Sequence, residues 1–76
     1  MKVWAYVFIT TSTPRLVVQA IRKIDGVAQA DALFGTPDAI AIVEGEDIAT
    51  MDAVIDRIVD VPGVRATDTK VARWID

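Results

Sequence analysis

The run from residue 2 to residue 12 is apolar on both sides of an extended chain, and it constrains the fold more than any other feature. Successive side chains of a strand point to opposite faces. One face would carry Val3, Ala5, Val7 and Ile9. The other face would carry Trp4, Tyr6 and Phe8. Such a strand needs apolar cover on both sides, from its own chain or from a second one.

Two later segments have the spacing of amphipathic helices. The first follows Thr13, a predicted N-cap, with Pro14 at the first helical position, and it ends at Asp25 and Gly26. Its predicted apolar face consists of Leu16, Val17, Ala20, Ile21 and Ile24. The second begins at Asp47, which we expect to cap it. Its predicted apolar stripe consists of Ile48, Met51, Val54, Ile55, Ile58 and Val59.

Three further strands are predicted over residues 27–34, 39–44 and 64–74, and the turn residues 35–38 join the first two as a hairpin. The resulting order is βαββαβ. Right-handed crossovers then place both helices on one face of a four-stranded antiparallel sheet. We therefore predict an α+β, ferredoxin-like fold with residues 1–76 as a single domain. The pattern allows either face of the first strand to meet the helices.

The second face of this sheet would remain bare in a monomer. A chain of 76 residues is close to the lower size limit for a self-sufficient core. It has no cysteine for a disulfide and no histidine or cysteine for a zinc site. We therefore expect a homo-oligomer, a dimer or a ring of dimers, whose interface includes Trp4, Tyr6 and Phe8.

The composition also limits the chemistry. Without histidine or cysteine, the usual pairing of a nucleophile with a base is missing, so we predict no catalytic residue and no cofactor. Asp52, Asp56 and Asp60 repeat along one helix face, which is typical of a solvated stripe and not of a metal site.

The charge and the absence of long apolar runs bear on partners and location. The net charge is −3 and the basic residues are scattered, so direct DNA binding is not expected. No apolar run approaches the ~20 residues of a membrane span, and the start of the chain is unlike a signal peptide. These features predict a soluble, cytoplasmic protein that does not contact a membrane.

Two motifs within this element order resemble a known family. They are Gly35-x-x-Asp38 in the hairpin and Val61-Pro62-Gly63-Val64-x-x-Thr67-x-Thr69 towards the end of the chain. With the βαββαβ order, they resemble the effector-binding RAM domain of the Lrp/AsnC transcriptional regulators over nearly the whole chain. The resemblance implies a domain that binds amino acids or related effectors between subunits and assembles dimers into rings.

The resemblance also implies a ligand site at Gly35, Thr36, Asp38, Thr67 and Thr69. Backbone N–H groups at a glycine turn suit the carboxylate of an amino acid, and the carboxylate of Asp38 suits its ammonium group. Threonine hydroxyls can serve either end. No helix-turn-helix precedes the first strand, so we expect a stand-alone domain that regulates transcription indirectly, on its own or assembled with a full-length Lrp/AsnC regulator.

Two other functions share this predicted topology. A small dimeric cofactor-independent enzyme, such as a monooxygenase, would need an acid–base group in a pocket between sheet and helices, and no histidine is present to supply it. An ACT-like regulatory module would need a glycine in the turn after the first strand, where this chain has residues 11–14, Thr-Ser-Thr-Pro. The non-enzymatic effector-binding domain is the leading hypothesis.

Overall fold

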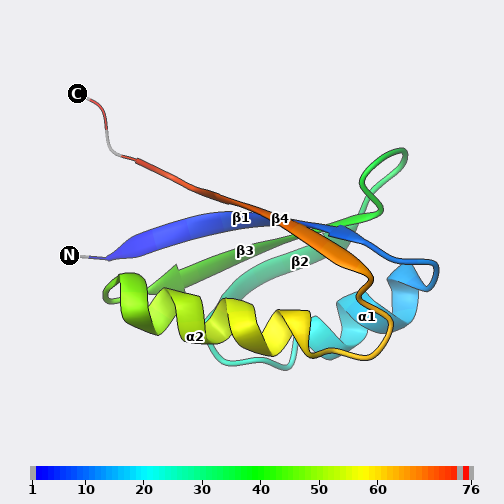
Figure 1. Ribbon diagram of the computed structural model, residues 1–76, viewed down its shortest axis with the longest axis horizontal. Coiled ribbons are helices and arrows are strands. Elements are labelled where there is room, and N and C mark those ends of the chain that lie inside the picture. Colours follow the sequence, from blue (N-terminus) through cyan, green and yellow to red (C-terminus); the bar gives the residue numbers. More distant parts are fainter. Residues whose placement is uncertain (1, 74, 76) are drawn as a thin grey trace.

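The computed structural model describes residues 2–73 and 75 and confirms the predicted element order. The elements are β1 (Val3–Thr10), α1 (Pro14–Ile21), β2 (Val27–Ala32), β3 (Ala39–Gly45), α2 (Ile48–Val59) and β4 (Ala66–Val71). The strands form one antiparallel sheet in the order β2-β3-β1-β4. Both helices lie on the same side of it, as Figure 1 shows. The fold is the predicted ferredoxin-like one.

The face of the sheet that meets the helices, here called the inner face, is lined by small and medium side chains. Ala5, Val7 and Ile9 of β1 are fully buried there. Other strands contribute the buried residues Ala30, Ala39, Ala41 and Val43. The helices contribute Val17, Val18, Ile21, Met51, Val54, Ile55 and Ile58. Each fully buried Val or Ile contributes about 1.5–3 kcal/mol, so this layer holds the fold together.

The opposite side of the sheet, here called the open face, carries the larger side chains Trp4, Tyr6, Phe8, Ile40 and Ile42. Tyr6 pairs with Ile42, and Phe8 pairs with Ile40, so aromatic and aliphatic side chains lie side by side on it. Trp4 and Tyr6 each remain 37% exposed. The described part of the chain leaves this apolar face uncovered.

The first helix differs from the prediction in length and in orientation. It ends at Ile21 instead of Ile24, which lies in the following turn and still packs against the core. Leu16, predicted on the apolar face, is 66% exposed, and Val18 is buried in its place. Thr13 makes no side-chain cap, although Pro14 does take the first turn as predicted. Gly26 has the expected positive φ of 96°.

The second helix matches the prediction more closely. Asp47 caps it, because its Oδ1 accepts a hydrogen bond from Thr50 N at 2.8 Å. This backbone donor holds the pKa of the Asp47 carboxyl below its ordinary value. At the two ends of the predicted stripe, Ile48 and Val59 are exposed. In the part of the chain described here, neither helix is long and apolar enough to cross a membrane.

Three predicted strands are shorter in the structure. β1 spans Val3–Thr10, where residues 2–12 were predicted. β2 stops at Ala32, so Leu33 and Phe34 belong to the hairpin loop. β4 begins at Ala66 and ends at Val71. The predicted end of this strand, Trp74, lies outside the described residues.

Candidate functional site

The loop between β2 and β3, residues 33–38, rises from the sheet on the side away from the helices (Figure 1). Phe34 at its tip is fully exposed, and the peptide bond between Thr36 and Pro37 is cis. Gly35 has a φ of +102°, a conformation that favours glycine. Apart from its two chain neighbours, none of the described residues has an atom within 4 Å of where a Cβ would stand. The turn therefore requires this glycine for its backbone conformation and not for space.

Asp38 ties the base of this loop to the end of β1. Its backbone N–H donates to Ile9 O at 3.0 Å, and its C=O accepts from Leu33 N at 2.8 Å. Its carboxylate Oδ2 accepts from Thr11 N at 3.0 Å. One carboxylate oxygen of Asp38 thus has a structural partner within the chain, a role that the sequence did not indicate.

The same Thr11 organises the loop between β1 and α1. It is 4% exposed, and its hydroxyl accepts a hydrogen bond from Thr13 N at 3.0 Å. Gly63 packs against this loop: a Cβ there would stand 2.9 Å from Thr13 Oγ1, and its φ is +98°. The Val61-Pro62-Gly63 motif therefore serves close packing of two loops.

The last strand presents its residues alternately to the two faces. Thr67 pairs with Ile9 and Thr69 with Val7, so both threonines lie on the inner side of the sheet, where they are half-buried. Asp68 pairs with Phe8 and Lys70 with Tyr6, which places both charged residues on the open face. The strand thus turns a carboxylate and an ammonium group towards the exposed aromatic side chains.

A surface pocket of about 390 Å³ lies where β1, β4 and the hairpin loop meet. Its lining residues are Phe8, Thr10, Pro37, Ala66, Thr67 and Asp68. Of the predicted ligand residues, Thr67 lines this pocket. Gly35, Thr36, Asp38 and Thr69 are not among the described residues that line it.

Sequence reasoning missed Thr10, Pro37, Ala66 and Asp68 as members of this site. A signal for Asp68 was present, because in the run Thr67-Asp68-Thr69 alternation sends the central residue to the face opposite the threonines. Pro37 and Thr10 had no local signal, since only the sheet and the hairpin bring them together.

The chemistry of the pocket is mixed. Phe8 and Pro37 offer apolar surface, and Thr10 and Thr67 are hydroxyl residues. The carboxylate of Asp68, a lining residue, lies 3.2 Å from Lys70 Nζ, and Lys70 itself is not among the lining residues. Within the described residues, no group of three or more acidic side chains is placed to hold a metal ion.

The space between sheet and helices is different in character. Among the residues described, Thr11 is the one buried polar side chain, and the core around it is apolar. An acid–base group in this layer, which the enzymatic alternative needs, is therefore not found in the described part of the chain.

Comparison with known proteins identifies the family. The model of the Lrp/AsnC ligand binding domain matches residues 5–73. The chain belongs to this family of ligand-binding domains of transcriptional regulators. A search among curated protein sequences finds no match.

Solved structures share the fold. TTHA0845 from Thermus thermophilus is 26% identical, with a TM-score of 0.87, over 97% of this chain and 96% of that one. AsnC of E. coli is 17% identical, with a TM-score of 0.84, over 96% of this chain and 52% of that one. The transcriptional regulator NMB0573 of Neisseria meningitidis, solved as a complex with L-Met, is 17% identical, with a TM-score of 0.77, over 95% and 50%. The chain thus spans about half of each of these two regulators.

Proposed function

We propose that this domain binds an amino acid, or a closely related zwitterion with an apolar side chain, at the end of the open face next to the hairpin. The observation that carries the proposal is the ion pair of Asp68 and Lys70 beside a pocket lined by Phe8 and Pro37. The family to which the chain belongs, and the complex of NMB0573 with L-Met, support an effector of this class.

Each part of such a ligand has a partner of matching chemistry. The ammonium group suits the Asp68 carboxylate, and the carboxylate group suits Lys70. Both side chains are about two-thirds exposed, so exchanging their mutual contact for contacts to a ligand costs little. The apolar side chain of the ligand would then contact Phe8 and Pro37.

The residues of the predicted ligand site keep distinct roles in this proposal. Thr67 contributes directly from the pocket wall. Asp38 acts by holding the hairpin against β1 through Thr11 N. Gly35 and Thr36 would contribute from a neighbouring subunit, since the hairpin loop is exposed and rises on the side of the sheet away from the helices. Thr69 lies on the inner side of β4, so it would support the pocket through the strand and not by direct contact with the ligand.

A second copy of the chain is the proposed cover of the open face. Trp4, Tyr6 and Phe8 form its central row with Ile40 and Ile42 beside them, and the two helices of the described structure both lie on the other side of the sheet. Burial of this patch against an identical patch gives a dimer, and contacts of the hairpin tips could extend dimers into a ring. A full-length regulator of the same family could provide the same surface, through which the domain would regulate transcription.

A thermal-shift screen of L-amino acids, beginning with L-Met, tests ligand binding. A ligand that binds only the native state stabilises it by about 2.7 kcal/mol at one hundred times its Kd, enough for a clear rise in Tm. Asp68→Asn and Lys70→Gln should each remove the shift, and Asp52→Asn, an exposed change on α2, should preserve it. A shift that survives both pocket changes, or no shift with any amino acid at millimolar concentration, would contradict the proposal.

A further inference from the structure

β2 forms one edge of the sheet, since its only neighbour in the described sheet is β3. The side chains at positions 28, 30 and 32 of this strand are all alanines, which leave the edge sterically open. Unpaired N–H and C=O groups along such an edge are a template for a strand of another molecule. Unless a side chain blocks these groups, the β2 edge could pair with a strand of another molecule.

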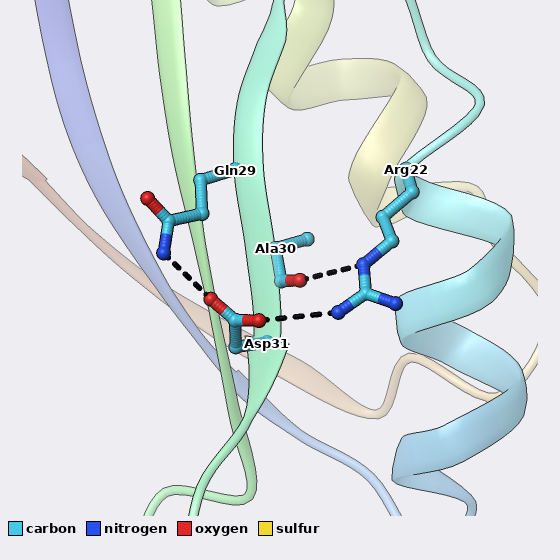
Figure 2. A network of polar contacts seen from close by, with 4 residues as sticks. All are labelled: Arg22, Gln29, Ala30 and Asp31. Atoms are coloured by element: carbon cyan, nitrogen blue, oxygen red, sulfur yellow. Dashed lines mark hydrogen bonds and ion pairs between the residues drawn. The ribbon is translucent and has the colours of Figure 1, made fainter.

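One residue lies across this edge. Arg22, the C-cap of α1, donates from Nε to Ala30 O at 2.8 Å and from Nη2 to Asp31 Oδ1 at 3.1 Å. Figure 2 shows the guanidinium group alongside β2, facing the outward carbonyl of Ala30. An incoming strand would need that same carbonyl as an acceptor, so Arg22 occupies the place of its N–H group.

Two side chains of β2, Gln29 and Asp31, help to hold the guanidinium group in place. Gln29 Nε2 donates to Asp31 Oδ2 at 2.8 Å, while Asp31 Oδ1 accepts from Arg22. Both oxygens of the Asp31 carboxylate thus have partners, which orients the carboxylate towards Arg22 (Figure 2). Arginine suits this role because its planar fork can serve a carbonyl and a carboxylate at once.

The uncovered edge would be complementary to itself. In an antiparallel pair centred on Ala30, the N–H of Ala30 would donate to Ala30 O of a second copy, and Ala30 O would accept from the N–H of that second Ala30. Gln29 of each chain would then stand opposite Asp31 of the other, as an amide–carboxylate pair, and alanine would stand opposite alanine at positions 28 and 32. The register shift between Val27 and Gln29 distorts only one end of this segment.

We infer that Arg22 is a latch on the β2 edge: while its guanidinium is bound to Ala30 O, the edge cannot pair with β2 of a second copy. Self-association is thereby confined to surfaces other than this edge. β2 and β4 are at opposite edges of the sheet, so the latch does not depend on the proposed ligand pocket.

The test compares Arg22→Ala with Lys23→Ala, a matched change at the next position. Lys23 is exposed, and its one hydrogen bond among the described residues is made by its backbone N–H, which donates to Ala20 O, so truncation of its side chain removes no hydrogen bond. Molar mass is measured by light scattering and sedimentation over a range of protein concentrations, with circular dichroism as a check of folding. Arg22→Ala should raise the association constant about tenfold or more over the wild type, and Lys23→Ala should not change it. Arg22→Lys keeps the positive charge but not the planar guanidinium group, so its association constant should lie between those of the wild type and Arg22→Ala.

A second change identifies the surface that associates. Ala32 is exposed on β2, and by alternation its N–H points outward like that of Ala30. Proline is tolerated on an edge strand and removes this donor, so Ala32→Pro should reverse the effect of Arg22→Ala. Arg22→Ala with and without Ala32→Pro is also compared in proteins that carry Tyr6→Asp. Because Tyr6→Asp weakens association through the open face, any association that remains there reports pairing of the β2 edges.

Two results would overturn the latch. One is an unchanged mass for both Arg22→Ala and Arg22→Lys at every concentration. The other is an increase in mass that Ala32→Pro does not reverse, because association would then occur through another surface.

Discussion

The two faces of this sheet use the same strand in opposite ways. On the inner face, β1 presents Ala5, Val7 and Ile9, all fully buried beneath the helices. On the open face it presents Trp4, Tyr6 and Phe8, of which the first two are 37% exposed. The two faces differ in side-chain size: the helices pack on small and medium side chains, and the large aromatic side chains lie on the face that the helices do not cover. Apolar character alone therefore does not identify the core.

The largest effect that this comparison predicts comes from truncating an inner-face contact. Ile58→Ala, at a fully buried position of α2, should lower the free energy of unfolding by about 2–5 kcal/mol, because it leaves a cavity in the core. Ile42→Ala on the open face should cost much less when the protein is dilute enough to be monomeric. Urea unfolding of both variants at low concentration is the measurement, and equal losses would contradict the distinction between the faces.

Substitutions on the open face should affect self-association more than the free energy of unfolding. Tyr6→Asp places a charge in the centre of the proposed interface, and we expect it to weaken self-association by about 2 kcal/mol or more, roughly thirtyfold. Sedimentation equilibrium would measure this, with Asp56→Asn on α2 as a control that leaves association unchanged. If the wild-type protein stays monomeric at high micromolar concentration, the proposal that a second copy covers the open face is contradicted.

At the rim between the two faces, Asp38 holds the hairpin to β1. Asp38→Ala leaves the part-buried Thr11 N–H without its acceptor, which should destabilise the fold by about 1–3 kcal/mol. Asp38→Asn keeps an acceptor oxygen and should recover most of this loss. Thermal unfolding and the exchange rate of the Thr11 amide would report it. If Asp38→Ala retained full stability, the carboxylate would be free for a ligand, as the sequence suggested.

The smallest effect is expected at the cap of α2, because burial and not capping holds this helix on the inner face. Asp47→Ala should reduce stability modestly at pH 7, and Asp47→Ser should restore it. The lowered pKa of Asp47 means that its contribution is present above the unfolded-state value of about 3.9 and is lost as the pH falls through the lower folded value. The stability difference between wild type and Asp47→Ala should thus shrink below pH of about 4, and a difference that grows on acidification would contradict the cap.

Much of the fold was predictable because its signals are local. The alternation in the first strand, the glycine at position 26 and the cap at Asp47 each act within a few residues. All three appear in the structure, with the strand over Val3–Thr10 where residues 2–12 were predicted. The orientation of α1 was not predictable in the same way. Both Leu16 and Val18 are apolar, and only contact with the sheet selects Val18 for burial.

The proposed ligand site was harder to predict from the sequence than the fold. The motif residues Gly35 and Gly63 were recognised, but the structure uses them for a left-handed turn and for close packing of loops. We did not predict Asp68 as a site residue, although it pairs with Phe8 and lines the pocket. A pocket is defined by residues from separate elements, and sequence periodicity describes one element at a time.

By itself, the sequence determined most of the secondary structure, the topology and the presence of apolar side chains on both faces of the first strand. The tertiary structure alone decided which face of β1 is covered, that Asp38 is bound by Thr11, and that Arg22 reaches the edge of β2. The physical reason is the distance along the chain over which each interaction acts. Periodicity, caps and turns depend on neighbouring residues, whereas packing distance and hydrogen-bond partners depend on groups that only the closed sheet brings together.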